Sequence, residues 1–189
     1  MIITPTTGNA MPVGTGGVGK FSWYIPYYTA ERDPILLSYF GLAAGNDTAK
    51  RRKIAETFLR PQTWGNFCEK TTSDNCTHPP YYDGEGRLIA VGPPSDKSEA
   101  VRYFLPDSFH GHFNATDENN CDKYPQTCTG HLANVKCDWS TFAVSQAHHL
   151  GIPVKSSGPM VAGGYSYTDT MDIYRAANFT RNDVLIYWW

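Results

Sequence analysis

Tryptophan residues are the side chains of this sequence best suited to bind a small ligand. The apolar run 184–189 ends in two of them, and Trp139 stands at the start of a predicted helix. An indole exposed to water is unfavourable unless the ring has a partner. A tryptophan at a helix start combines a π face, which attracts cations, with free backbone amides, here those of Ser140 and Thr141, which attract anions. These residues predict a pocket for a zwitterion.

The elements that would position this pocket lie in the last third of the sequence. A helix is predicted from 139 to about 149, followed by a short strand at 152–154. The capping-box pattern at 166–169 opens a second helix, and a strand follows at 184–187. Strand, helix and strand at this spacing predict a βαβ unit and therefore the α/β class. In such sheets ligands bind beyond the carboxyl ends of strands and at helix N-termini, where the tryptophans stand.

Earlier parts of the chain give weaker signals. Helix starts are predicted at Asp33-Pro34 and at Asn46-Asp47, and both helices are expected to pack on the core. A short strand is predicted at 87–91. Residues 61–80 and the long stretch 106–136 are predicted to be loops.

Residues 1–20 are rich in Gly, Thr and Pro and are predicted to be an extended segment leading into the domain. Within them, 14–20 match the G-x-x-x-x-G-K spacing of a phosphate-binding loop. Phe21 stands where a metal-binding Ser or Thr is required, and Pro26 interrupts the helix that should follow. A nucleotide-binding enzyme is therefore the third-ranked function.

Composition limits the classes of partner. The chain has 189 residues, 41% hydrophobic and 14% aromatic, which is enough for one domain with a core. A formal net charge of -2 gives no basic face for nucleic acid, and the basic run 50–53 is expected to be solvated. No apolar run approaches the roughly 20 residues that span a bilayer. Residues 1–12 lack the pattern of a signal peptide.

Cysteines and glycosylation sequons indicate a secretory compartment. Short spacings in polar sequence favour disulfides, with Cys68 and Cys76 as a local pair and a second pair within the remaining three. One cysteine is left over, which suggests a fragment of a longer secreted protein. No C-x-x-C spacing indicates zinc, so no metal is expected. The cysteines are Cys68, Cys76, Cys121, Cys128 and Cys137, and the sequon asparagines are Asn46, Asn75, Asn114 and Asn178.

Catalytic signatures are lacking. The sequence has no G-x-S-x-G motif and no Ser/His/Asp or Cys/His signature, and the cysteines are expected to be oxidised. The histidines at 110, 112, 148 and 149 have no neighbouring carboxylates that would complete a metal site. The chain is expected to be neither an enzyme nor the holder of a cofactor.

Three segments share a motif order with one family. Residues 21–26 read Phe-Ser-Trp-Tyr-Ile-Pro, 137–141 read Cys-Asp-Trp-Ser-Thr, and 172–189 lead from a predicted helix to Val-Leu-Ile-Tyr-Trp-Trp. In order and spacing these resemble the Gly-Trp-Tyr-Val-Pro, Gly-Trp-Gly-Cys and Tyr-Trp-Thr-Pro segments of the glycine betaine/choline substrate-binding proteins of ABC transporters. The resemblance extends over most of residues 14–189.

The resemblance implies a fold and a site. It implies a periplasmic-binding-protein-like (type II) fold of two α/β lobes, in which residues 14–189 form the second lobe, a three-layer sandwich with a central sheet. Trp139 and Trp189 would be walls of an aromatic cage, with Trp188 as the neighbouring alternative and Trp23 near the crossover between lobes. The amides of Ser140 and Thr141 would take the carboxylate. The sequence departs from the family where Ser-Thr replaces Gly-Cys and where it ends before Thr-Pro.

The function implied is binding of a small quaternary-ammonium zwitterion in a cleft between lobes, as a transport or sensing module. Its partners would be the ligand, the missing first lobe, and a membrane transporter or receptor. The Cys-rich insertion from about 106 to 137 and the sequons favour a eukaryotic extracellular relative. The alternative is a structural or adhesive extracellular glycoprotein domain that kept the fold without the ligand.

Overall fold

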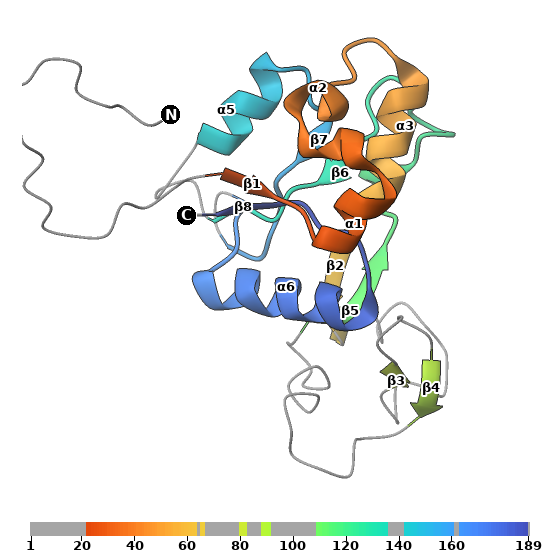
Figure 1. The fold of residues 1–189 in the computed structure, drawn as a ribbon, viewed down its shortest axis with the longest axis vertical. Coiled ribbons are helices and arrows are strands. Elements are labelled where there is room, and N and C mark those ends of the chain that lie inside the picture. Colours follow the sequence, from red (N-terminus) through yellow and green to blue (C-terminus); the bar gives the residue numbers. More distant parts are fainter. Residues whose placement is uncertain are drawn as a thin grey trace, which may run out of the picture.

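The computed structural model describes residues 22–63, 65–66, 80–82, 88–91, 109–135, 142–160 and 163–188 (Figure 1). These residues mix helices with small two-stranded sheets, as expected for the α/β class. The predicted segment 1–20 lies outside them. The helices are α1 (Tyr27–Arg32), α2 (Tyr39–Leu42), α3 (Thr48–Thr57), α5 (Phe142–His149) and α6 (Tyr167–Thr180), with 3-10 helices η1 (Pro34–Leu37) and η4 (Asp117–Asn119). The strands are β1 (Ser22–Tyr24), β2 (Arg60–Thr63), β3 (Pro80–Tyr82), β4 (Leu88–Val91), β5 (Phe109–Asn114), β6 (Gly130–His131), β7 (Val154–Lys155) and β8 (Ile186–Trp188).

The segment 130–135 connects the central strands. Its first two residues form β6, which pairs in parallel with β7. Parallel bridges then join Ala133 to Ile186 of β8 and Val135 to Tyr165. On its other side β8 pairs antiparallel with β1. β7 and β8 thus both run parallel to this segment rather than pairing with each other, and the segment itself lies in a stretch predicted to be a loop.

Two hydrophobic cores lie on opposite faces of these strands. Residues 184–187 contribute to both, because successive side chains of an extended segment point to opposite faces. Leu185 and Tyr187 pack in the core formed with η1, α2, α3 and α5. Val184 and Ile186 pack in the core formed with β5 and α6. Figure 1 shows α5 and α6 on the two sides of β1 and β8.

Helix α6 begins and ends at identifiable residues. The side chain of Ser166 accepts a hydrogen bond from the Asp169 amide at 3.1 Å, and the Asp169 carboxylate accepts one from the Ser166 amide at 3.1 Å. This capping box was predicted and is confirmed. The helix ends at Arg181, whose φ of 57° turns the chain toward β8.

The earlier helices agree with the sequence only in part. Asp47 caps α3 as predicted, and its side chain accepts from the Lys50 amide at 3.0 Å. Asp33-Pro34 opens a 3-10 turn, followed by the separate helix α2. Leu36 is buried, but Leu37 and Phe40 are 68% and 89% exposed, so the expected core packing is only half realised.

Two predicted loops contain strands. Residues 61–63 belong to β2 and 109–114 to β5, and these strands pair antiparallel with Arg60 opposite Asn114. Their sequences, Arg-Pro-Gln-Thr and Phe-His-Gly-His-Phe-Asn, lack the apolar run that marks a strand. Tertiary pairing overrides the local signal here. The predicted strand at 87–91 is found as β4.

One disulfide joins Cys121 to Cys128, as expected for a pair among the last three cysteines. Both are buried and pack against Ala55 of α3. Cys68, Cys76, Cys137 and the sequon of Asn75 lie outside the described residues. None of the helices in the described part of the chain combines the length and apolar composition needed to cross a bilayer.

Candidate functional site

The pairing of β1 with β8 decides where two of the predicted tryptophans lie. Ser22 is opposite Trp188 and Trp23 is opposite Tyr187. Paired residues share a face and successive residues alternate, so Trp23 and Trp188 lie on opposite faces of the ribbon. The two indoles therefore cannot be adjacent walls of one cage.

Trp23 is held on the α5 face. Its indole Nε1 donates a hydrogen bond to Oε1 of Gln146 in α5 at 2.8 Å. The Tyr39 ring meets it edge to face, with centroids 6.0 Å apart. The indole also packs against the core that contains Leu185 and Tyr187. Its polar atom and its ring both have protein partners, which is the arrangement of a structural tryptophan.

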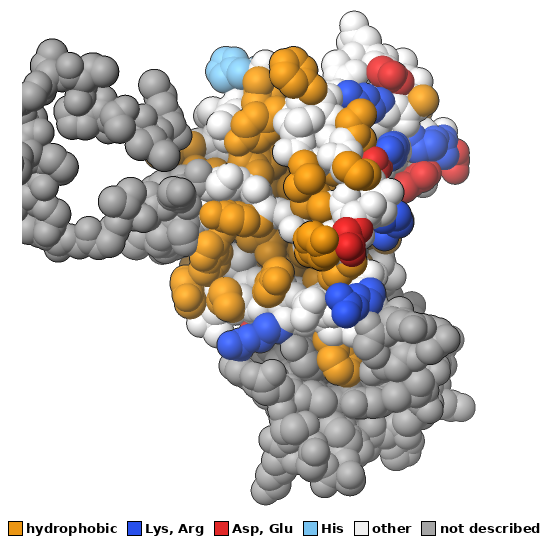
Figure 2. All heavy atoms as spheres, in the orientation of Figure 1, with side chains coloured by type: hydrophobic (Ala, Val, Ile, Leu, Met, Phe, Trp, Pro, Cys, Tyr) orange, Lys and Arg blue, Asp and Glu red, His pale blue; other side chains and the backbone are white. Residues whose placement is uncertain are grey.

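Trp188 lies on the α6 face and borders an open groove. Its ring centroid is 4.7 Å from that of Tyr167, the first residue of α6, with the rings tilted by 41°. Figure 2 shows hydrophobic side chains gathered over α6 and the neighbouring strands. The groove has a volume of about 260 Å³ and is lined by Tyr24, Ile25, Thr170, Met171, Tyr174, Ile186 and Trp188.

The chemistry of this groove is aromatic and uncharged. Among the described residues that line it, none is acidic or basic. Tyr24 and Tyr174 are 45% and 44% exposed, so their rings are accessible. The hydroxyl of Thr170 is already used, because it donates to the Ser166 carbonyl at 3.0 Å. A cation in this groove would meet π faces rather than carboxylates.

Sequence reasoning missed most of this groove. Tyr24 follows Trp23 in a strand, so alternation separates these two side chains, and the register with β8 places Tyr24 on the Trp188 face. Met171 and Tyr174 lie three positions apart in α6, a spacing that puts them on one face of the helix. Trp139, Ser140, Thr141 and Trp189 lie outside the described residues, so the predicted cage they would form stays a prediction.

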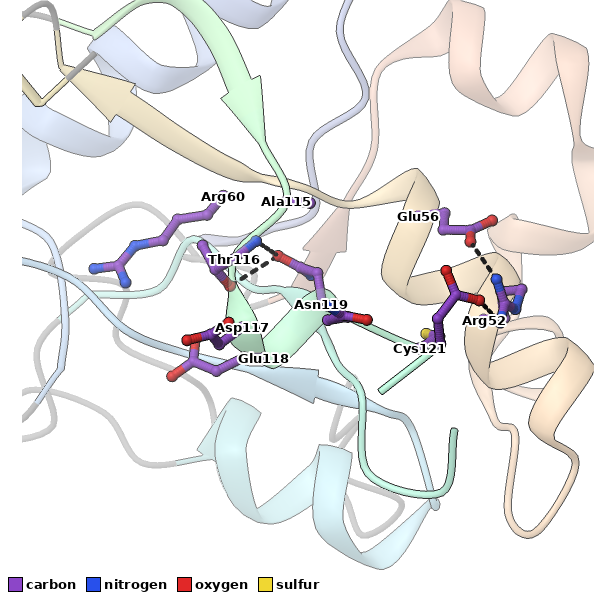
Figure 3. Close-up of a pocket in the computed structure, with 11 residues that line it drawn as sticks. Arg52, Glu56, Arg60, Ala115, Thr116, Asp117, Glu118, Asn119 and Cys121 are labelled. Carbon is purple, nitrogen blue, oxygen red and sulfur yellow. Dashed lines mark hydrogen bonds and ion pairs between the residues drawn. The ribbon is translucent and has the colours of Figure 1, made fainter. Parts of the chain in front are cut away.

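A second, larger depression of about 790 Å³ is polar (Figure 3). Arg52 dominates one side and pairs with Glu56 at 3.2 Å and with Asp122 at 2.6 Å. Asp117 and Glu118 lie apart from these pairs and do not converge with them on one point. Arg52 partly neutralises two of the four carboxylates, and Glu118 pairs with Lys155 at 2.5 Å outside the lining. Exposed ion pairs of this kind are typical of a solvated face.

Asn119 holds the wall of this depression in place. Its amide nitrogen donates to the carbonyls of Ala55 and Thr129, and its oxygen accepts from the Thr116 amide at 3.0 Å. These bonds tie the turn before the disulfide to α3. The contacts are structural.

A histidine and a tyrosine form a buried polar pair. The Tyr165 hydroxyl and Nε2 of His131 are 3.0 Å apart. Burial lowers the pKa of His131 to about 3, with a smaller contribution from Arg60, and burial raises the pKa of Tyr165 to about 12. Both groups are therefore neutral near pH 7, and both are almost fully buried.

Metal ligation has no support in the described ranges. No group of three or more His, Cys, Asp or Glu side chains there could hold an ion. His148 and His149 are exposed at the end of α5 with their rings 5.4 Å apart. Burial lowers the pKa of His112 to about 4.

Comparisons with known proteins give no relative: no family model, no curated protein and no solved structure matches the chain.

Proposed function

We propose that the chain binds a small quaternary-ammonium compound, of the glycine betaine or choline kind, with the ammonium group in the groove beside Trp188. The observation that carries this proposal is the groove's lining of two tyrosines and a tryptophan without a described charged residue. A quaternary ammonium has no N–H bonds to donate, so π faces suit it better than hydrogen-bond acceptors do. Ammonium ions with N–H groups would leave those donors unsatisfied here.

The proposed affinity follows from the rings. Each aromatic face contributes about 0.5 to 2 kcal/mol to cation binding, depending on desolvation. Three rings contribute together about 1.5 to 6 kcal/mol, which corresponds to dissociation constants for the groove alone between roughly 80 mM and 40 μM. Tighter binding requires contacts for the anionic end, which we assign to the amides of Ser140 and Thr141 and to a second lobe closing the cleft.

The biological setting belongs to the same proposal. The buried disulfide supports a chain that folds in an oxidising compartment. We place the protein outside the cell or in the secretory pathway, as the second lobe of a type II binding-protein fold that serves a transporter or receptor. Parallel strands joined through helices support an α/β lobe of this kind.

The test is a titration of the full 189-residue chain by isothermal calorimetry with two probes. Choline and its neutral isostere 3,3-dimethylbutan-1-ol have the same shape, so their difference isolates the charge. We expect choline to bind at least several-fold more tightly, and Tyr174→Leu to weaken choline binding about two- to five-fold. Tyr124→Leu is the matched control, because Tyr124 is 41% exposed and does not line the groove. Equal binding of both probes, or no binding of choline at about 100 mM, which is above the weak end of the expected range, would refute the proposal.

A structural or adhesive glycoprotein domain is the second candidate. It is favoured by exposed apolar side chains outside the groove, including Leu37, Phe40 and Phe142 at 68%, 89% and 67% exposure. In that case Trp188→Leu would lower the free energy of unfolding while no titrated ligand produced heat. Specific choline binding by the wild-type chain decides against this reading.

A further inference from the structure

The groove-lining face of α6 continues beyond the groove. Met171, Tyr174 and Asn178 are separated by three and four positions, so they form one stripe along the helix. The first two line the groove. Asn178 therefore lies one turn past Tyr174, about 6 Å farther along the helix axis.

Asn178 is also the acceptor of a glycosylation sequon, Asn178-Phe179-Thr180. Its side chain is exposed to solvent. Thr180 points the other way: it is buried, and its hydroxyl donates to the Ala176 carbonyl at 2.8 Å. The helix thus fixes Asn178 outward on the groove side and leaves its amide free to carry a substituent.

We propose that Asn178 carries an N-linked glycan whose first sugars lie against Tyr174 at the open end of the groove. In the covalent step, Nδ2 of Asn178 bonds to the anomeric carbon of a lipid-linked oligosaccharide diphosphate. The bond from that carbon to the phosphate oxygen breaks, the polyprenyl diphosphate leaves with the electron pair, and an amide proton is lost to base.

The position of this glycan has a consequence for access. A sugar ring presents apolar C–H groups on one face, and the half-exposed Tyr174 ring is an apolar surface within its reach. A glycan there would leave room for a small molecule but exclude a protein partner from this end of the groove. The inference rests on the secretory setting of the proposed function but not on which ligand the groove binds, so it can fail or hold separately from choline binding.

The test uses the full 189-residue chain secreted from a eukaryotic cell line behind a heterologous leader. Peptide mass spectrometry measures occupancy of Asn178, and hydroxyl-radical footprinting measures oxidation of Tyr174 in wild type and in Asn178→Gln. We expect substantial occupancy and an increase of about two-fold or more in Tyr174 oxidation when the glycan is removed. Tyr124 is the internal control, because its exposure of 41% is close to the 44% of Tyr174.

Two matched variants complete the design. Asn114→Gln removes the sequon at the end of β5 and should leave Tyr174 oxidation unchanged. Thr180→Ser keeps both the sequon and the buried hydroxyl, and should retain the glycan. An unmodified Asn178 overturns the proposal, as does an occupied Asn178 whose removal leaves Tyr174 oxidation the same.

Discussion

Replacing Trp23 by Phe should weaken the fold without weakening the groove. The substitution keeps a ring for the contact with Tyr39 and removes the donor that bonds Gln146 at 2.8 Å. Loss of one such hydrogen bond costs about 0.5 to 1.5 kcal/mol of net stability. Because Trp23 and Trp188 occupy opposite faces of the β1–β8 ribbon, choline affinity should stay within about two-fold of wild type.

The stability effect is measured by urea unfolding followed by far-UV circular dichroism, which does not depend on the altered indole. With a slope of about 2 kcal/mol per molar urea, a loss of 1 kcal/mol lowers the midpoint by about 0.5 M. A double-mutant cycle with Gln146→Leu isolates the bond, and we expect a coupling of about 0.5 to 1.5 kcal/mol.

The paired measurement is the effect of Trp188→Leu on choline binding. Removing that π face should weaken binding by about 0.5 to 2 kcal/mol, which is roughly two- to thirty-fold. If Trp23→Phe weakened choline binding as strongly as Trp188→Leu, the two indoles would act in one cage and the assignment to opposite faces would be wrong. Absence of coupling between Trp23 and Gln146 would equally contradict the geometry.

The remaining predictions concern stability. Replacing Cys121 and Cys128 together by Ala opens a short loop with a sequence separation of 7. The free energy of unfolding measured in urea should fall by about 2.5 kcal/mol, and an unchanged midpoint would refute this prediction. Burial lowers the pKa of His131 from 6.5 to about 3, so the unfolded chain binds a proton at a higher pH than the folded chain does. The stability contributed by the neutral, buried ring is fully present above pH 6.5 and falls by up to about 1.4 kcal/mol per pH unit as the pH falls toward 3. His131→Gln should flatten this dependence of stability on pH between about pH 7 and 5. Gly111→Ala should lower the stability of the fold more than Gly45→Ala does. Both glycines have a positive φ, which costs an alanine about 1 to 2 kcal/mol, but only at Gly111 would the new Cβ lie 2.1 Å from a threonine methyl. Equal thermal midpoints of the two variants would contradict this prediction.

The sequence predicted those helices whose first residues contain a recognisable capping side chain. The capping box at Ser166 and the N-cap at Asp47 satisfy backbone amides locally, so their helices can be placed without knowledge of the fold. The disulfide between Cys121 and Cys128 was expected as one of three possible pairs, because a short spacing restricts the choice.

The rest depends on contacts between distant residues. The segment 130–135 contains Gly130, His131 and Asn134, which interrupt any apolar alternation, yet it forms the centre of the parallel arrangement. Its extended form is imposed by hydrogen bonds to neighbouring segments, such as that from the Ala133 amide to the Leu185 carbonyl at 2.9 Å. The extended conformation of this segment therefore could not be predicted from its local sequence pattern.

The candidate site shows the same limit. Tryptophan placement correctly drew attention to β8, but which face Trp188 occupies follows only from its register with β1. A slip of one residue would exchange Trp188 with Tyr187 and move the groove to the α5 side. The tyrosines of the groove become neighbours of Trp188 only through this register and the packing of α6.

The pairing of β1 with β8 also governs the order in which the chain can fold during synthesis. Ser22 in β1 can pair only after Trp188 has been synthesised, and Trp188 lies at the opposite end of the described sequence. Residues 184–187 also supply side chains to both cores. Until these last residues leave the ribosome, neither core can close, and its apolar surfaces have only non-final contacts. Folding is therefore of high contact order, and a nascent chain stalled before residue 184 would be a substrate for chaperones rather than a partly finished domain.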